Sequence, residues 1–213
     1  MPMSTPRPIP RLIDFSVPEA KVLADLLAIR ADLISVKELS RTYALCFEVS
    51  GTHPYVLSSL AVAAIVRYCR TFGSGVRTRL QSEWLEALSE EHRCTHRRVK
   101  DLRDKWIAHS VNSFEETQIV AAVLTLDDVT EVLQIGGQGR NILAIEPAEF
   151  RALFDLSHAL KLEVEKAAMI ENQVVLKAAR IWPPHKLLAR PDAGWDWNKE
   201  YHPEEVRRDF VDR

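Results

Sequence analysis

Apolar residues recur at helical spacing over the first seventy positions of this chain. The first amphipathic stretch follows residues 16–19 (S-V-P-E), a capping-box pattern with proline in the first turn, and extends to about Glu48. It is predicted as one kinked helix or as two helices. Residues 50–54 (S-G-T-H-P) form a break. Residues 55–72 are nearly apolar all round until Arg67, which is typical of the central helix of a bundle.

Two further helical segments are more polar. A charged helix is predicted from about Gln81 to Ala108, and we interpret its Trp106 as a core or dimer-packing residue rather than a base-stacking platform. A long helix is predicted from Glu149 to about Trp182, where two prolines end it. Its apolar face is formed by Phe150, Leu153, Phe154, Leu160 and Val164.

The pattern between these two helices changes to that of strands. Residues 118–126 and 129–135 are rich in β-branched side chains, and Asp127-Asp128 between them is suited to a turn. Residues 136–141 (G-G-Q-G-R-N) are predicted as a second turn before a short strand at 142–145. We interpret these segments as a small antiparallel sheet. The glycines do not open a helix, so they are not a dinucleotide-binding loop.

Together these elements predict a mainly α fold. We expect one antiparallel helical bundle over residues 1–182, with a small antiparallel β insert at about 117–145, its strands lying within 118–145. Residues 183–213 are predicted to form an irregular C-terminal tail that contains Trp195, Trp197 and Tyr201.

Composition restricts the class of protein. The net charge is −2, so any contact with nucleic acid needs a local basic patch. The three cysteines show no C-x-x-C spacing, which favours neither a zinc site nor a disulfide framework. The N-terminus lacks the apolar segment of a secretory signal, and the longest apolar stretch is shorter than the roughly 20 residues of a membrane span. A cytoplasmic protein without a membrane partner is therefore expected.

Residues 102–112 (L-R-D-K-W-I-A-H-S-V-N) carry the candidate chemistry. Arg103 is a permanent cation whose forked geometry suits phosphate, and His109 is a side chain suited to proton transfer near neutral pH. Six steps of 100° place His109 about 120° from Arg103 in an ideal helix. The two side chains of one chain meet only if the helix ends or bends there, which favours a site shared between two chains.

The R-D-K-x-x-A-H-S string resembles the R-[polar]-x(4–5)-H signature of the HEPN superfamily (higher eukaryotes and prokaryotes nucleotide-binding), in particular an abortive-infection-like branch. The resemblance implies a helical homodimer with a composite site between the motif helices. Many members are metal-independent endoribonucleases that act as toxins or defence effectors, some with an antitoxin partner. Some toxins of the family carry H-x-Y, whose tyrosine is adenylylated; Val111 stands at that position here, so this regulation is not implied.

The resemblance implies roles for individual residues. Arg103 stabilises charge on the phosphate and His109 transfers the proton when a ribose 2′-hydroxyl attacks its neighbouring phosphate. Asp104, the polar neighbour of the signature, orients Arg103 or the histidine. No metal or cofactor is implied. The candidate RNA-binding residues are Arg70, His96, Arg97, Lys100, Lys105 and Ser110.

Other readings of the same residues stay open. Arg103 is also suited to a surface ion-pair network, and His109 to a helix C-terminus. His92 and His96 have a metal-ligand spacing, but no carboxylate follows in the H-E-x-x-H arrangement, and a solvated or RNA-facing surface is the favoured reading. The main functional alternative is a catalytically silent HEPN-like module that binds nucleic acid, nucleotide or protein. A plain interaction protein is the third.

Overall fold

The computed structural model describes residues 10–73, 78–107, 115–126, 129–141 and 144–194. Within these ranges the chain is mainly helical with one small antiparallel sheet, which confirms the predicted fold class. The elements, in order, are a 3-10 turn Pro18–Ala20, α1 Lys21–Glu48, α2 Pro54–Arg70, α3 Glu83–Glu86, α4 Glu90–Leu102, a π-helical turn Arg103–Ile107, β1 Glu115–Leu126, β2 Val129–Asn141, α5 Pro147–Arg180 and α6 Pro184–Leu188.

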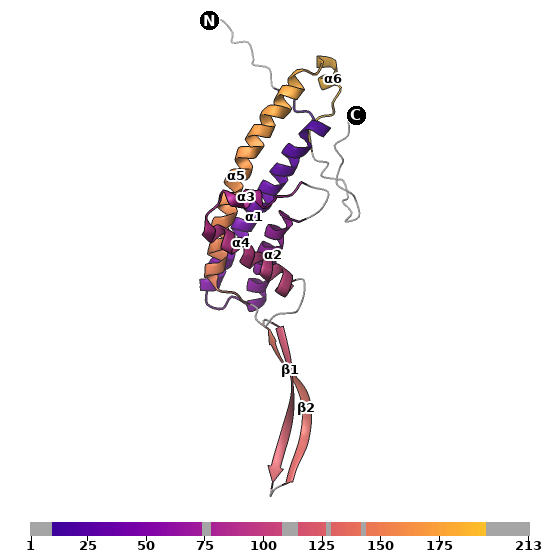
Figure 1. Ribbon diagram of the computed structural model, residues 1–213. Coiled ribbons are helices and arrows are strands. Elements are labelled where there is room, and N and C mark those ends of the chain that lie inside the picture. Colours follow the sequence, from indigo (N-terminus) through magenta and orange to yellow (C-terminus); the bar gives the residue numbers. More distant parts are fainter. Residues whose placement is uncertain (1–9, 74–77, 108–114, 127–128, 142–143, 195–213) are drawn as a thin grey trace, which may run out of the picture.

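The long helices α1 and α5 run antiparallel along each other, and α2 and α4 pack against the half of this pair nearer the hairpin (Figure 1). The core lies between these four helices. Its largest fully buried side chains are Tyr43, Tyr68, Phe150, Ile29, Leu33 and Ile65. None of the described helices is long and apolar enough to cross a membrane.

The N-terminal half of the bundle differs from the sequence prediction at one helix start. Helix α1 is a single helix, which decides between the two alternatives. The predicted capping box at residues 16–19 is wrong, because the first turn starts as a 3-10 turn after Val17 without a side-chain cap. The backbone N–H of Ser16 instead donates to the Asp14 carboxylate at 2.9 Å.

The predicted helix from Gln81 to Ala108 is interrupted within the described residues. Ser89 has an extended backbone between α3 and α4, and its hydroxyl accepts a hydrogen bond of 3.2 Å from the N–H of His92. Serine is a preferred N-cap because this bond satisfies one of the first helical donors. Glu90 and Glu91 in the first turn favour a new helix start for electrostatic reasons.

Strands β1 and β2 form a hairpin that projects from one end of the bundle (Figure 1). The predicted turn at residues 136–141 is wrong, because these residues continue β2 and pair with residues 115–120 of β1. A β-bulge at Ala122/Val123 leaves Leu133 without a partner in the register. Of the predicted third strand, residues 142–143 lie outside the described ranges, and Ala144 and Ile145 are in no strand.

The two ends of the described chain meet beyond the far end of the bundle. Ile13 and Asp192 form an isolated antiparallel bridge, and the N–H of Ala193 donates to the carbonyl of Leu12 at 3.0 Å. Arg11 adds an ion pair of 2.6 Å with Asp192. The predicted irregular tail therefore contains a short helix, α6, and an ordered clasp; residues 195–213, with Trp195, Trp197 and Tyr201, lie outside the described ranges.

Candidate nucleic-acid site at the end of α4

The motif begins where α4 changes into a wider helical turn. Leu102 is the last residue of α4, and Arg103–Ile107 form a π-helical turn. Leu102 and Trp106 are buried in the core, which anchors the turn on both sides and confirms the core assignment of Trp106. Single π turns are frequently found at functional sites. Because the backbone of Arg103–Ile107 is π-helical, the ideal step of 100° per residue does not apply over these five residues.

An open pocket of about 550 Å³ lies against this turn. One wall comes from the C-terminal part of α2 and the other from α4 and the π turn. The pocket brings together four residues that the sequence proposes for catalysis or RNA binding, namely Arg70, Lys100, Arg103 and Asp104. Val66, Cys69, Phe72 and Gly73 complete the lining. Three basic side chains beside one open hollow are suited to an anionic ligand.

Arg103 and Asp104 form an ion pair at the pocket. Nη1 of Arg103 donates a hydrogen bond of 2.6 Å to Oδ1 of Asp104, and each side chain is about half exposed. This hydrogen bond raises the pKa of Arg103 above its ordinary value, so the guanidinium is charged at any physiological pH. The bond uses one of the five N–H donors of the guanidinium. Asp104 can therefore orient Arg103 while other donors bind a phosphate.

Arg70 has a structural role in addition to its place in the pocket. Its guanidinium makes hydrogen bonds to both carboxylate oxygens of Asp32, which is 4% exposed, and Arg67 lies 3.7 Å from the same carboxylate. A buried carboxylate is costly unless it is paired. Asp32 is thus shared by Arg67 and Arg70, and Arg70 joins α2 to α1 while it also lines the pocket.

His96 corrects a prediction, since the sequence placed it on an exposed or RNA-facing surface. It is 9% exposed, its Nδ1 shares a hydrogen bond of 2.8 Å with the Tyr68 hydroxyl, and its ring contacts Phe72 edge-on. Burial lowers the pKa of His96 to about 4, with a smaller contribution from Lys100 and Arg97. The ring is therefore neutral near pH 7 and joins α4 to α2 as a packing residue.

The remaining basic residues do not form one continuous track. Arg97 donates to Glu90 at 2.8 Å on the outer side of α4, and Lys105 lies 3.4 Å from Asp101. Neither residue lines the pocket with Arg103. Exposed pairs of this kind are usually solvated surface. His109, Ser110 and Val111 lie outside the described residues.

Cys69 is a pocket residue that the sequence did not single out. Burial raises the pKa of its thiol to about 11, although Arg103 and Lys100 act in the opposite direction. The thiol therefore stays protonated and serves as an apolar wall rather than a nucleophile. The feature of the sequence that could have identified Cys69 as a pocket residue is its position directly before the candidate Arg70 on α2. Across the described residues, no group of three or more histidine, cysteine, aspartate or glutamate side chains is placed to hold a metal ion.

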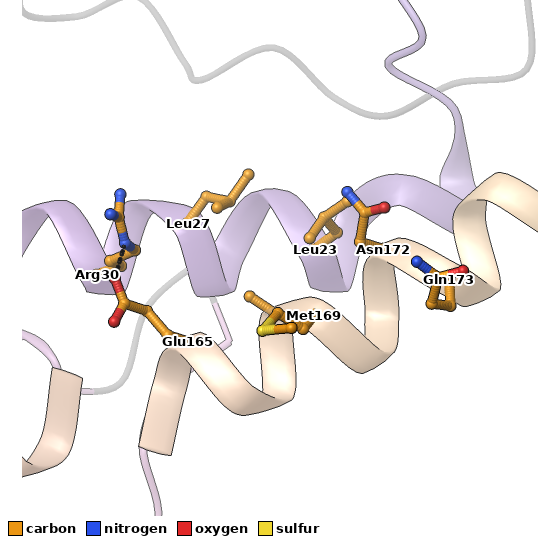
Figure 2. Close-up of a pocket in the computed structure, with 8 residues that line it drawn as sticks. Leu23, Leu27, Arg30, Glu165, Met169, Asn172 and Gln173 are labelled. Atoms are coloured by element: carbon orange, nitrogen blue, oxygen red, sulfur yellow. Dashed lines mark hydrogen bonds and ion pairs between the residues drawn. The ribbon is translucent and has the colours of Figure 1, made fainter. Parts of the chain in front are cut away.

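A second hollow, of about 480 Å³, lies between α1 and α5 (Figure 2). Leu23, Leu27 and Met169 form its apolar part, and the ion pair between Arg30 and Glu165, 2.6 Å long, stands at one end. Asn172 and Gln173 stand at the other end. No histidine or cysteine lines it, and its one lining carboxylate, Glu165, is held by Arg30 and also accepts a hydrogen bond of 2.7 Å from Lys161.

No known protein family, curated protein or solved structure matches this chain. The functional argument therefore depends on the motif and on the described pocket.

Proposed function

We propose that this chain is a metal-independent endoribonuclease of the HEPN type that acts as a toxin or defence effector in the cytoplasm. The observation that carries the proposal is the pocket in which Arg103, Asp104 and Lys100 converge at the π turn. The R-x(5)-H motif runs through this turn. A chance occurrence of the motif on a solvated helix face would not require an open basic pocket at its arginine.

Arg103 is proposed to bind the scissile phosphate. Its guanidinium is charged, half exposed and held by Asp104, so it is oriented before the substrate arrives. Preorganised donors stabilise the extra negative charge of the transition state without a reorganisation cost. Lys100 adds a second positive charge from the preceding turn of α4.

His109 is proposed to transfer the proton, by the following reaction. The ribose 2′-hydroxyl attacks the adjacent phosphorus, and the bond from phosphorus to the 5′-oxygen breaks. One histidine accepts the hydroxyl proton and one protonates the leaving oxygen. The products are a 2′,3′-cyclic phosphate and a 5′-hydroxyl. DNA has no 2′-hydroxyl and is not cut.

The proposal includes a homodimer, in which Arg103 and His109 of two copies line one cleft, and an antitoxin as a possible protein partner. A two-fold axis near the motif brings two copies of His109 together, one for each proton transfer of the reaction. The pocket is open toward solvent at Arg103 and Asp104, each about half exposed, which leaves this face accessible to a second copy.

The test is cleavage of total cellular RNA by the purified chain in excess chelator. Wild type is expected to cut, whereas Arg103→Ala and His109→Ala are expected to lose cleavage while they keep the wild-type circular dichroism spectrum. Arg98→Ala is the matched control, because Arg98 lies on α4 but pairs with Glu149 at 3.3 Å and does not line the pocket.

Two results would contradict the proposal. Cleavage that Arg103→Ala and His109→Ala leave intact would assign the activity to other residues or to a contaminant. RNA that is bound and shifted in a native gel but stays intact, with no co-purified inhibitor present, would favour the catalytically silent module instead.

A further inference from the structure

The β1–β2 hairpin is a surface that the proposed chemistry does not use. It extends away from the bundle, and no described helix packs along either strand (Figure 1). A two-stranded ribbon alone is marginally stable in water, and three or more strands or a packing partner are normally needed. The described residues of the hairpin nonetheless expose several large apolar side chains.

Strand pairing divides these side chains between two faces, because successive residues of a strand point to opposite sides. Paired residues share a face, so one face carries the pairs Ala121–Ile135, Val123–Val132 and Thr125–Thr130, and Ile119 opposite Gly137. The two threonine hydroxyls lie 3.0 Å apart, in agreement with this assignment. We name these seven side chains (Ile119, Ala121, Val123, Thr125, Thr130, Val132 and Ile135) the apolar ribbon face.

The apolar ribbon face is strongly exposed and carries no charge. Ile119 is 70% exposed, Ile135 62%, Val123 58% and Val132 57%. The opposite face is mixed, because there Leu124 pairs with Glu131 and Ala122 with Gln134. Contiguous exposed apolar patches mark interaction sites in soluble proteins. Because only the apolar ribbon face lacks charged side chains, it is the face that we infer to be covered by a partner.

We propose that the apolar ribbon face packs against the same face of a second copy of this chain. An uncharged surface needs no complementary charge on its partner, so two identical faces related by a two-fold axis are compatible. Two stacked ribbons also supply the second layer that a lone hairpin lacks. The inference rests on the proposed homodimer, in which the same second copy contacts the motif face and the apolar ribbon face.

The area of the apolar ribbon face limits how much the ribbon contact stabilises the dimer. From Ile119 to Thr125 the strand covers about 20 Å, and two strands are about 10 Å wide, so the contact buries on the order of 400 Å² in total. Stable interfaces bury about 1,200 Å² or more. The ribbon contact therefore strengthens a dimer that is also held near the motif, and its loss weakens this dimer rather than abolishing it.

Val123 and Val120 provide a matched pair of substitutions on one strand. They lie three residues apart on β1 and hence on opposite faces. The dimer dissociation constant of the full chain is measured by sedimentation for wild type, Val123→Glu and Val120→Glu. Val123→Glu is expected to weaken the dimer at least tenfold, and Val120→Glu less than about threefold, with thermal unfolding of the helices unchanged in both.

A cross-linking experiment locates the contact directly. Val123→Cys and Val120→Cys are each combined with Cys94→Ser, which removes an exposed native thiol, and are treated with a short bismaleimide. Covalent dimers are expected for Val123→Cys only. The ribbon contact would be overturned if Val123→Glu did not weaken the wild-type dimer, or if both positions cross-linked equally. Either result would leave the composite site standing. A chain that is monomeric at all concentrations would overturn both.

Discussion

Oδ1 of Asp104 accepts a hydrogen bond of 2.6 Å from Nη1 of Arg103, at the point where α4 changes from an α-helix to a π turn. This hydrogen bond joins Arg103, which is proposed to bind the scissile phosphate, to Asp104, the next residue in the sequence. The carboxylate orients the guanidinium, but its own negative charge opposes the binding of phosphate. Under the proposed function, Asp104 is therefore expected to affect substrate binding and the chemical step in opposite directions.

Asp104→Ala is predicted to separate these two effects. Loss of the carboxylate removes the orienting bond, so the single-turnover cleavage rate is expected to fall about tenfold, which is about 1.4 kcal/mol of transition-state stabilisation. Loss of the negative charge is expected to tighten RNA binding, measured with an uncleavable 2′-deoxy substrate. A cleavage rate equal to that of wild type would show that Asp104 does not position Arg103.

Lys100→Ala is predicted to weaken RNA binding in a salt-dependent way. Lys100 lines the pocket beside Arg103, and each phosphate contact to a single strand contributes about 0.7 to the slope of log K against log salt. The variant is expected to lower this slope by about that amount in a titration of affinity against salt. Arg98→Ala is the control, and a slope that changes equally in both variants would argue against a contact specific to the pocket.

Tyr43→Phe is predicted to destabilise the fold. The buried Tyr43 hydroxyl donates to the carbonyl of Ile145 at 2.5 Å and accepts from the N–H of Ile145 at 2.7 Å. The bonds tie α1 to the segment between the hairpin and α5. Phenylalanine leaves both backbone groups unsatisfied, so the free energy of unfolding in urea is expected to fall by about 2 kcal/mol. Tyr55→Phe, at an exposed position, is expected to change it little.

His96 is predicted to make stability depend on pH between about 6.5 and 4. Burial lowers its pKa from 6.5 to about 4 in the folded state. Between these values the unfolded chain binds a proton that the folded chain does not, so stability falls as the pH is lowered through this window and is unaffected by His96 above it. The full loss is about 3 kcal/mol by the usual conversion.

The measurement is the free energy of unfolding at pH 7 and pH 4.5 in wild type and His96→Leu. The pH-dependent loss is expected to be smaller in the variant, which lacks the titrating ring. His185→Leu, at an exposed position, is the control and should keep the wild-type dependence. Equal losses in wild type and His96→Leu would show that the buried ring does not resist protonation.

Long helices were the part of the fold best predicted from the sequence, because helical periodicity over many turns is a strong signal. The break at Ser89 was not predicted, although Ser89 followed by two glutamates is a start signal for a helix. The hydrophobic pattern on either side of it continues at the same spacing and concealed the interruption. The glycines of β2 were interpreted as a turn, yet pairing with β1 outweighs their low strand propensity.

The sequence predicted only those parts of the candidate site whose residues lie close together on one helix. Arg103 and Asp104 follow Lys100 by three and four residues, so their proximity to it follows from helical geometry. The burial of His96 depends on Tyr68 of α2 and on Phe72 in the turn after it, and the pairing of Arg70 depends on Asp32 of α1. Contacts between helices are not encoded in the spacing along either one, so the sequence placed His96 on the surface and gave no sign of the ion pair that Arg70 forms.

The identity of the cleavage products tests the central claim most directly. RNA is cut in excess chelator, the sites are mapped, and each substrate is remade with a single 2′-deoxyribose on the 5′ side of a mapped site. The account predicts that wild type leaves a 2′,3′-cyclic phosphate and a 5′-hydroxyl, and that the single deoxy substitution abolishes cutting there. Cleavage that persists at the deoxy position, or 5′-phosphate products that disappear with chelator, would contradict it.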